Sequence, residues 1–424
     1  MTTAYPIRPI SDSEFPAFFA VIEHAFNSSW PSEPELQHEL PTIEFDRTLA
    51  AFDGSQMVGT AAAFTFQMTV PGGTATVAGV SAVAVLPSHR RRGILSSLMR
   101  RQLADVRDRG EAVAALFSAE SGIYGRYGYG PASSELEFTI RRGESVMAPP
   151  GPGRTQEAPR LRIAEPQDDN GVLASVYDHV QRSRPGMPAR DERWWDYTLW
   201  DPEHRRSGAS PMRCVLAEDD SGPRGYALFS ATPDWGDHGM PAGVLRVQEL
   251  MATDPAAHAA VWGDMLTRDL VAEVRAQSRP VDDPLPYLLA DGRRVRAQLG
   301  DGLWVRLVSV PQALTRRRYA CPVDVVIEVA DELIAENAGR WRLRAGPGAG
   351  GDGPAAAARA SCEPTSAPAD VILPVETLGA AYLGGTRLGA LAGAGLAAEL
   401  RPGAVAALSA ALTWDPAPWC PAIF

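Results

Sequence analysis

The stretch that decides the fold is residues 81–131, SAVAVLPSHRRRGILSSLMRRQLADVRDRGEAVAALFSAESGIYGRYGYGP. It begins with an apolar, valine-rich run, Ser81–Leu86, which is the pattern of a buried strand. A basic turn that ends in Gly93 follows, and apolar residues at helical spacing then predict a helix that starts at Ile94. A second apolar run, Ala112–Ser118, predicts the next strand, and a segment rich in tyrosine and glycine comes after it.

A basic glycine turn between a buried strand and an amphipathic helix is suited to binding an anion. The first N–H groups of a helix have no partner within the helix, and the helix dipole adds partial positive charge there. Gly93 lets the backbone approach a ligand, and the arginines at 90–92 can supply charge-assisted hydrogen bonds. An isolated run of arginines is more often a solvated surface turn, so the flanking strand and helix decide the interpretation as a diphosphate site.

These residues resemble the acetyl-CoA-binding core of the GNAT superfamily of N-acetyltransferases. The superfamily's pyrophosphate loop reads Arg/Gln-x-x-Gly-x-Gly/Ala, and the matching residues are Arg90-Arg91-Arg92-Gly93-Ile94-Leu95, with Leu95 in place of the second small residue. The string Ile123–Tyr129 is similar to the superfamily's aromatic-Tyr-x-x-x-Gly-aromatic signature, with Ile123 at its first place. The two motifs together are far more specific than either one alone.

Length and composition restrict the class of protein. A chain of 424 residues predicts two or three domains, and 45% apolar with 21% charged residues is typical of soluble globular proteins. The net charge of −11 argues against general nucleic-acid binding and suits a cationic substrate. The four cysteines lack the spacing of a metal site or a redox dithiol, so we expect no metal. They are Cys214, Cys321, Cys362 and Cys420.

Targeting signals are not evident in the sequence. The N-terminal segment has neither a charged region nor an apolar region of the kind found in signal peptides. No run of 18 apolar residues occurs, so we expect no membrane span. Together with the scattered cysteines, this predicts a cytoplasmic protein.

Residues 1–146 are predicted to form a complete GNAT domain. A first strand over residues 5–10 is followed by a helix over 12–25, for which Ser11 and Glu14 form a capping-box pattern. Antiparallel strands separated by turns then lead into the deciding stretch. The segment 147–159 is rich in proline and glycine and is predicted to be a linker.

Residues 160–310 are predicted to form a degenerate second GNAT-like domain. Residues 243–270 repeat the order of strand, short turn with proline, and helix. Ala256-Ala257-His258-Ala259 stands where the first copy has its arginines and glycine, so the anion-binding chemistry is absent. An unrelated α/β domain is the alternative. A tryptophan cluster over 194–200 is more typical of a core or an interdomain surface than of a ligand cage, and residues 303–310 are assigned to this domain as its last strand.

Residues 311–424 are predicted to form a third domain. Strands over 321–329 and 341–345 precede a Gly/Ala/Pro-rich loop, with a possible strand near 359–363, and three short helices follow at 375–383, 386–392 and 403–411. This order resembles a sterol-carrier-protein-like domain. The fold class is therefore α/β (α+β), with two GNAT-like domains in tandem followed by a sterol-carrier-like domain. The proline-rich end at Phe424 either docks into a site or only packs on its own domain.

The whole architecture, closing on Pro-x-x-Phe, resembles the enhanced-intracellular-survival (Eis) family. The resemblance implies a homohexameric enzyme that transfers acetyl from acetyl-CoA to primary amines, including aminoglycosides and lysine side chains. A second hypothesis, from another class, is a lipid- or partner-binding protein whose GNAT core binds CoA without turnover.

The resemblance also implies where acetyl-CoA binds. The diphosphate is expected on the turn at 91–93, with Arg90 close by, and the edge of the strand at 83–85 is expected to pair with the strand-like pantetheine. The residues expected to contact acetyl-CoA are Val83, Ala84, Val85, Arg90, Arg91, Arg92, Gly93, Ile94, Leu95, Ser96, Ala119 and Glu120.

The resemblance places Tyr124 as the acid that protonates the departing thiolate. A phenol has an unperturbed pKa near 10, so it keeps its proton at neutral pH. The alternative is a core aromatic residue, which is our interpretation of Tyr127 and Tyr129.

The family gives the role of base to the C-terminal carboxylate, here that of Phe424. An α-carboxyl has an unperturbed pKa of about 3.5, so it would need burial or a relay water. Rival bases are His89, which we interpret as a structural or cofactor contact, and Glu120. Phe26 and Trp30 are candidates for the wall of the substrate cleft.

Overall fold

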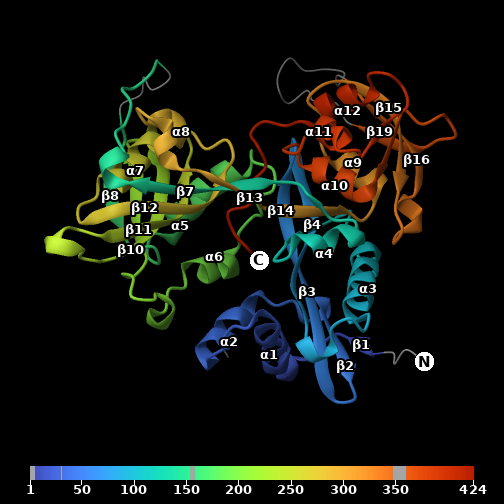
Figure 1. Cartoon of the computed structure of the whole chain (residues 1–424), viewed down its shortest axis with the longest axis horizontal. Coiled ribbons are helices and arrows are strands. Elements are labelled where there is room, and N and C mark those ends of the chain that lie inside the picture. The colour runs from blue at the N-terminus through green and yellow to red at the C-terminus, as the bar shows by residue number, and fades with distance from the viewer. Residues whose placement is uncertain (1–4, 30, 153–157, 347–359) are drawn as a thin grey trace. The chain divides into compact units, whose positions relative to one another are not determined.

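The computed structural model describes residues 5–29, 31–152, 158–346 and 360–424 (Figure 1). The chain divides into two compact units. The first contains residues up to Ser133, Gly302–Pro418 and Ile423–Phe424, and the second contains Ser134–Asp301 and Trp419–Ala422. Trp30, a predicted residue of the substrate cleft, lies outside the described residues.

The first unit is built on a sheet with the strand order β1-β2-β3-β4-β5-β14-β6. The strands are β1 (Ile7–Arg8), β2 (Thr48–Asp53), β3 (Gln56–Val70), β4 (Gly73–Val85), β5 (Val113–Phe117), β6 (Gly130–Pro131) and β14 (Leu303–Leu307). The predicted hairpins are confirmed, because Gly54 and Gly72 take positive φ in the turns between antiparallel β2, β3 and β4. The pairing of β4 with β5 is parallel.

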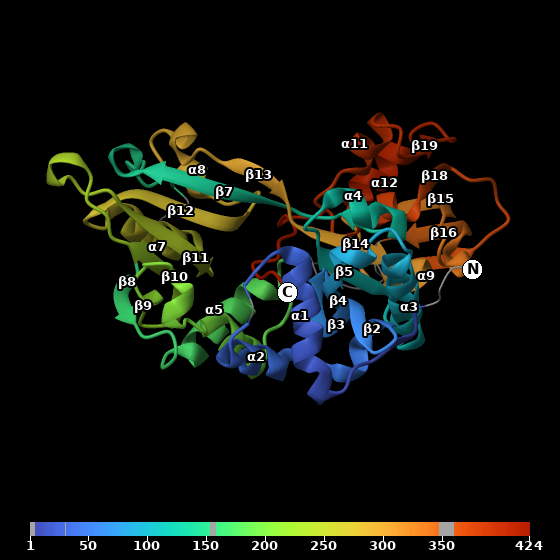
Figure 2. The same cartoon turned by 60° about the horizontal axis from the view of Figure 1, so that its bottom comes forward.

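Helices cover this sheet, and Figure 2 shows α1 and α2 at one side of its strands. They are α1 (Phe15–Phe26), α2 (Glu33–Glu39), α3 (Ile94–Asp108) and α4 (Ser121–Tyr124). The predicted capping box is confirmed, since the backbone N–H of Ser11 donates to Glu14 Oε2 at 3.0 Å, just before α1. The inward faces of α1 and α3 bury Phe15, Phe18, Leu98 and Met99, so amphipathic spacing positions both helices.

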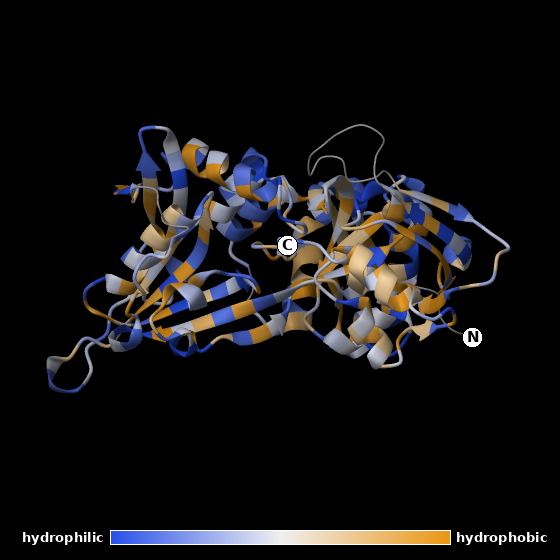
Figure 3. Ribbon diagram, turned by 90° about the horizontal axis from the view of Figure 1, so that it is seen from above, coloured by the Kyte–Doolittle hydropathy of each residue, from blue (hydrophilic) through white to orange (hydrophobic). Residues whose placement is uncertain are grey.

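The second unit repeats the architecture on a sheet with the order β13-β7-β12-β11-β10-β9-β8. Its strands are β7 (Ser134–Arg141), β8 (Arg160–Ala164), β9 (Arg213–Asp219), β10 (Gly222–Thr232), β11 (Gly243–Ala252), β12 (Val271–Pro280) and β13 (Gln298–Asp301). Its helices are α5 (Asn170–Gln181), α6 (Glu192–Leu199), α7 (Pro255–Thr267) and α8 (Leu285–Leu288). Hydrophobic and hydrophilic residues alternate along its long strands in Figure 3, as expected for strands with one buried face. Trp195 and Leu199 of α6 are buried, in agreement with a core role for the tryptophan cluster.

Two strands lie in sheets other than those expected from the chain order. We assigned residues 303–310 to the second domain, but β14 pairs with β5 and β6 in the first sheet. Residues 134–141 were included in the first domain, but β7 pairs with β12 and β13 in the second sheet. Both strands carry an apolar pattern, which predicts a strand without specifying its neighbour, so adjacency in sequence was the wrong guide here.

The C-terminal part of the first unit has a second sheet with the order β17-β16-β15-β18-β19. The strands are β15 (Val323–Ala330), β16 (Gly339–Ala345), β17 (Ser361–Pro364), β18 (Val371–Pro374) and β19 (Ala398–Glu399). The helices are α9 (Val310–Arg316), α10 (Val375–Tyr382), α11 (Leu388–Gly393) and α12 (Ala404–Leu412), which confirms the three predicted helices. Most of the predicted Gly/Ala/Pro-rich loop, residues 347–359, lies outside the described residues.

Two glycines allow α10 to lie directly on β6 and β14. A Cβ at Gly130 would lie 2.0 Å from the carbonyl oxygen of Glu376, and one at Gly379 would lie 2.3 Å from that of Val305. Real side chains never approach a backbone so closely, so these positions accept only glycine unless the elements separate. The sterol-carrier-like part is thus packed on the sheet that carries the GNAT motifs.

Candidate active site

The parallel strands β4 and β5 separate part-way along their length. Only Val77–Gly79 of β4 pair with β5, and their partners there are Val113–Ala115. Beyond that point β4 continues to Val85, with a register shift against β3 and a positive φ of 54° at Ala82. This bulge turns the strand locally. The backbone of Val83–Val85 therefore has an edge that β5 does not pair, which is the feature that a strand-like pantetheine needs.

The basic turn leads from this edge into α3. Arg91 takes φ 63° and Gly93 takes φ 83°, and no side chain caps the first turn of the helix. A Cβ at Gly93 would meet nothing within 4 Å. The N–H groups at the start of α3, which begins with Ile94, Leu95 and Ser96, are therefore not taken by a capping side chain, as a diphosphate site requires.

The three arginines of the turn have different surroundings. Arg90 Nη2 donates to the carbonyl of Ala25 at 3.2 Å, and Arg92 donates to the Tyr5 hydroxyl at 3.2 Å and to the Ser88 carbonyl at 3.0 Å. Arg91 is exposed and makes no hydrogen bond or ion pair with the described residues. Its guanidinium is therefore the one of the three that is uncommitted and available to a phosphate.

The His89 side chain is held by one neighbour in the turn and by the last residue of β2. It is 8% exposed, its Nδ1 lies 2.9 Å from Ser88 Oγ, and its Nε2 lies 3.2 Å from Asp53 Oδ2. Both ring nitrogens thus have partners in the protein. This arrangement favours the structural role over that of a base.

Tyr124 is held at the end of α4 in a hydrophobic cluster. The side chain is 9% exposed and packs among apolar residues that include Val80 and Met99. Burial, followed by the nearby Tyr127 and Glu120, raises the pKa of Tyr124 to about 12. Its hydroxyl makes no hydrogen bond with the described residues, so it is free to donate to a bound group.

The other two tyrosines of the signature are structural in this arrangement. The Tyr127 hydroxyl lies 3.0 Å from Ser96 Oγ, which ties α4 and the turn after it to α3. Tyr129 is fully buried, and its ring lies 6.1 Å from that of Tyr124 in an edge-on arrangement. Ser96, predicted as a cofactor contact, therefore already has a protein partner.

Phe424 lies where β4 and β5 begin to separate. Its ring centroid is 4.8 Å from that of Phe66 and 5.4 Å from that of Phe117, the last residue of β5. A Cβ at Gly79, the last residue of β4 that pairs with β5, would lie 3.1 Å from the Phe424 ring. The structure thus joins the end of the described chain to the opening of the strand pair.

Sequence reasoning missed Phe66, Phe117 and Gly79. A signal for Gly79 was present, because an isolated glycine within a strand marks a close approach of another group. Of the other predicted residues, Ala119 and Glu120 are exposed just beyond β5. Phe26 is 52% exposed at the end of α1, and no described contact links it to the residues above.

The corresponding helix start in the second unit is already occupied. The carboxylate of Asp254 accepts from the N–H groups of Ala256 and Ala257 at 2.9 and 3.0 Å, and it pairs with Arg224 at 2.7 Å. An internal anion thus takes the place that a diphosphate would fill. This explains physically why the second copy lacks the anion site.

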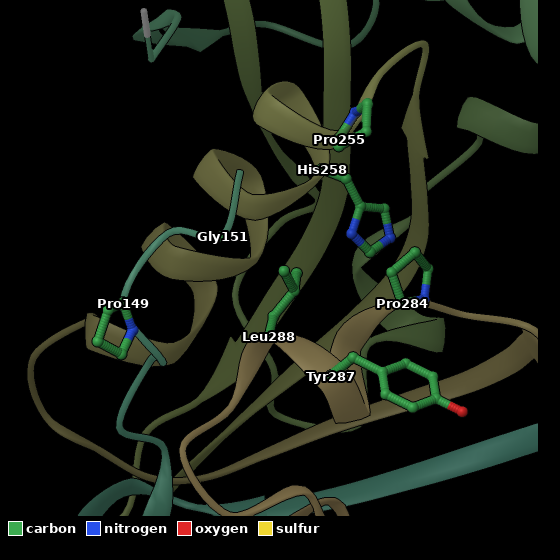
Figure 4. A pocket seen from close by; sticks show the side chains of 7 residues that line it. All are labelled: Pro149, Gly151, Pro255, His258, Pro284, Tyr287 and Leu288. Atoms are coloured by element: carbon green, nitrogen blue, oxygen red, sulfur yellow. The ribbon is translucent and has the colours of Figure 1, made fainter. Parts of the chain in front are cut away.

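A cavity of about 360 Å³ lies beside α7 and α8 in the second unit (Figure 4). His258 Nε2 lies 3.5 Å from Asp283 Oδ1, and burial lowers the pKa of this histidine to about 4. His258 is therefore neutral at physiological pH. The lining residues are Pro149, Gly151, Pro255, His258, Pro284, Tyr287 and Leu288.

Family models match three consecutive parts of the chain. Residues 6–132 and 186–307 each match an acetyltransferase (GNAT) domain, and residues 310–421 match a sterol carrier protein domain. The chain is 42% identical over 423 residues to an uncharacterized N-acetyltransferase of Streptomyces avermitilis, with 99% of both chains covered. It is 35% identical to the N-acetyltransferase Eis of Mycobacterium tuberculosis, covering 80% of this chain and 79% of that protein.

The chain belongs to the Eis family of GNAT N-acetyltransferases. The crystal structure of Eis1 from Mycobacterium abscessus agrees, with a TM-score of 0.81 and 31% identity over 99% of this chain and all of that one. A GCN5-related N-acetyltransferase from Anabaena variabilis, at 18% identity and a TM-score of 0.82, shares the fold over 99% of this chain and all of that one.

This Eis-family chain is therefore an N-acetyltransferase, and its GNAT domains indicate acetyl-CoA as the acetyl donor. The predicted family, fold class and enzyme class are confirmed. None of the described helices combines the length and apolar character needed to cross a bilayer. Within the described ranges, no three His, Cys, Asp or Glu side chains gather as metal ligands.

Proposed function

We propose that this enzyme transfers acetyl from acetyl-CoA directly to primary amines, with Tyr124 as general acid and the carboxylate of Phe424 as general base. The observation that carries the proposal is the position of Phe424, whose ring packs on Phe117 where β4 and β5 separate. A residue in that place is adjacent to the strand edge that suits the pantetheine arm. Acid, base and donor site then belong to one region of the first unit.

The residues present fit acetyl-CoA. The unpaired edge of Val83–Val85 offers backbone groups to the pantetheine amides, and the uncapped start of α3 offers N–H groups to the diphosphate. Arg91 adds a free guanidinium, while Arg90 and Arg92 hold the turn in shape. We assign Ile94, Leu95, Ser96, Ala119 and Glu120 to the surroundings of the bound molecule.

Acetyl-CoA supplies the acetyl group as a thioester. As the new N–C bond forms and the C–S bond breaks, the sulfur leaves as a thiolate that needs a proton. The Tyr124 hydroxyl gives that proton, and its raised pKa of about 12 keeps it protonated at neutral pH. The phenolate regains its proton from solvent after the products leave.

The carboxylate of Phe424 takes the proton from the attacking amine and releases it to solvent after the products leave. This role requires that Phe424 carries the free α-carboxyl group of the chain. The rings of Phe66 and Phe117 pack on the ring of Phe424 and so fix the residue that carries this carboxylate. Glu120, exposed beyond β5, is the rival base.

The net charge and the family support primary amines as the acceptor class. A net charge of −11 attracts cationic amines over long range, and the likeness to Eis proteins supports aminoglycosides and lysine side chains as acceptors. Phe26 is our candidate for one wall of the cleft. Family membership also supports a homohexamer in the cytoplasm, which sedimentation of the purified protein and fractionation of cells would test.

The rival proposal, a CoA-binding protein that carries lipid in its C-terminal part, has less support. The fully buried Arg317 donates to the carbonyls of Tyr382, at the end of α10, and Leu412, at the end of α12. A guanidinium and its carbonyl partners thus lie between the ends of these helices. A lipid chain would instead need an apolar space there.

A thiol-release assay with acetyl-CoA and a panel of amines tests the proposed function. The panel should contain an aminoglycoside, a polyamine, a lysine peptide and an aromatic amine, with mass spectrometry of the products. We expect release of one CoA per acetyl group added for at least one primary amine. If the protein binds acetyl-CoA tightly but acetylates none of the amines, the proposal is overturned in favour of the binding protein.

A further inference from the structure

The turn that carries Tyr124 packs on a buried arginine of the first unit. Gly128 takes φ 81°, and a Cβ there would lie 2.6 Å from Cζ and 2.9 Å from Nε of Arg306. The guanidinium therefore lies directly against the backbone of Gly128, where only glycine leaves room for it. Arg306 is fully buried and comes from β14, the strand that pairs with β5 and β6.

This turn holds Tyr124 through its backbone. The N–H of Tyr129 donates to the carbonyl of Tyr124 at 3.3 Å, and the N–H of Gly128 donates to the carbonyl of Gly125 at 2.8 Å. Two backbone hydrogen bonds thus close the turn over residues 124–129, and Gly128 and Tyr129 supply both donors. A shift of Gly128 would therefore pass directly to the residue that carries the proposed acid.

The carboxylate of Asp331 holds Arg306 in place. Arg306 Nη2 donates to the two oxygens of Asp331 at 2.8 and 2.7 Å, and the Asp331 side chain is 1% exposed. The same carboxylate accepts from the N–H groups of Leu333 and Ile334 at 3.0 and 3.1 Å and from Asn337 Nδ2 at 2.9 Å. Asp331 follows β15 of the sterol-carrier-like part, so that part fixes the arginine against the turn.

The loop after Asp331 also adds apolar contacts around the acid. Ile334 is 5% exposed and belongs to the hydrophobic cluster that contains Tyr124. Leu333 packs against the same cluster. The sterol-carrier-like part therefore supports the surroundings of Tyr124 both through an ion pair and through apolar packing.

Stability alone does not explain the pair of Arg306 and Asp331. Buried ion pairs can often be replaced by apolar residues without loss of stability, because desolvation of the charges offsets their attraction. Arg306 adds to this cost, since its Nε and Nη1 have no hydrogen-bond partner within the described part of the chain. A pair with this cost is better explained by the position that it gives to Gly128.

We propose that Arg306, fixed by Asp331, is a positioning residue that sets the place of the Tyr124 hydroxyl in the reaction. The packing of Arg306 on Gly128 stands on the contacts above, and the effect on catalysis rests on the proposed role of Tyr124 as general acid. On this view the sterol-carrier-like part serves catalysis as the support of the acid.

The place of the acid matters because proton transfer needs close approach. The Tyr124 oxygen must come within hydrogen-bond reach of the departing sulfur, and a displacement of about 1 Å can lower a rate by roughly 100-fold. The hydroxyl makes no hydrogen bond with the described residues, so its place depends on the backbone turn and on the apolar packing of the ring.

Arg306→Lys tests the proposal in the full-length enzyme. Lysine keeps the positive charge and can still reach Asp331, but it lacks the planar group that lies on Gly128. We expect faster hydrogen–deuterium exchange at residues 124–129, a kcat lower by roughly 10- to 100-fold, and an acetyl-CoA dissociation constant within about twofold of the parent value. Arg306→Met combined with Asp331→Asn leaves no unpaired charge in the core and should change the same readouts in the same directions.

Arg47→Lys is the matched control. Arg47 and Glu111 form another buried pair of the first unit, with two N–O distances of 2.7 Å and side chains that are 2% and 6% exposed. The described hydrogen bonds of the Arg47 side chain run to Glu111 and Thr65. We expect a loss of stability in urea like that of Arg306→Lys, with unchanged exchange at residues 124–129 and an unchanged kcat.

The Tyr124→Phe background shows whether Arg306 acts through the acid. If it does, adding Arg306→Lys to Tyr124→Phe should lower kcat by much less than it lowers the kcat of the parent enzyme. An equal fall in both backgrounds would overturn the positioning role, and so would faster exchange with an unchanged kcat.

The exchange measurement judges the contact by itself. Unchanged exchange at residues 124–129 in folded Arg306→Lys, or in the folded double variant, would overturn the hold of Arg306 on the turn. Parent-like turnover by Tyr124→Phe alone would instead refute the proposed acid and, with it, the catalytic part of this proposal. Failure of the proposed function is thus distinguished from failure of the contact.

Discussion

The ring of Phe424 lies 5.4 Å from the ring of Phe117, the last residue of β5. Phe424 also approaches Gly79, the last residue of β4 that pairs with β5. The final residue of the described chain is therefore fixed at the point where the two strands of the donor site separate. This contact connects the C-terminal segment to the motifs near residue 90, which are more than 300 positions earlier in the sequence.

Removal of the Tyr124 hydroxyl should slow the reaction without weakening donor binding. In Tyr124→Phe the buried ring and its contact with Tyr129 remain, but the proton donor is gone. We expect kcat to fall by roughly 10²- to 10⁴-fold, with an acetyl-CoA dissociation constant near the parent value by calorimetry. Tyr287→Phe, at an 86% exposed position, is the control. Parent-like turnover by Tyr124→Phe would remove Tyr124 from the mechanism.

Arg91 should contribute more to donor affinity than to rate. Its guanidinium is uncommitted in the structure, so its loss removes one charge-assisted bond to the diphosphate without loosening the turn. Such bonds contribute about 1.5–3 kcal/mol, so Arg91→Ala should raise the acetyl-CoA dissociation constant by roughly 10- to 100-fold while kcat at saturation changes little. Arg100→Ala, at an exposed position on α3, serves as the comparison. Equal affinities for the two variants would place the diphosphate elsewhere.

A methyl group at Gly79 should disturb the seat of Phe424. A Cβ there would lie 2.3 Å from the Phe66 ring and 3.1 Å from the Phe424 ring, so both rings must move. For Gly79→Ala we expect destabilisation of about 1–3 kcal/mol from overpacking and a lower kcat. Gly263→Ala, on α7 with nothing near the added methyl, should instead be neutral or stabilising in thermal unfolding. Unchanged activity of Gly79→Ala would show that the Phe424 contact is dispensable.

The free energy of unfolding should fall steeply above pH 10. Burial raises the pKa of Tyr124 to about 12 and raises those of Tyr129, Tyr177 and Tyr319 further. Above pH 10 the unfolded chain loses these protons while the folded chain keeps them, so the folded state binds more protons and stability decreases as pH rises. Each such tyrosine lowers the free energy of unfolding by about 1.4 kcal/mol for each pH unit between its unfolded and its folded pKa. Urea unfolding between pH 8 and 11 measures this slope, and a flat profile would contradict the burial of these phenols.

The local elements of this fold could be predicted from sequence, because their signals are local. The capping pair Ser11 and Glu14 marked the start of the first helix, and Gly93 marked the turn before α3. The three C-terminal helices followed from their apolar periodicity and from glycine breaks. Such features depend on residues within a few positions of one another.

The long-range relationships could not be predicted in the same way. Nothing in the pattern of residues 303–307 specifies β5 as their neighbour. The contact of Phe424 with Phe117 and the insertion of Trp419 beside Ser278 depend on the path of the whole chain. The separate roles of Arg90, Arg91 and Arg92 also needed the structure, since three adjacent arginines look equivalent in a sequence.

The C-terminal carboxylate is the most direct test of the whole account. A chain that ends in the amide of Phe424, made by ligation of a synthetic C-terminal peptide, keeps the ring and its contacts but lacks the base. The matched control is the same ligation with a free carboxylate. We predict that the amide binds acetyl-CoA with the affinity of the control and that its kcat for amine acetylation falls by roughly 10²-fold or more. An amide that turns over at the rate of the control would contradict the assignment of Phe424 as the catalytic base.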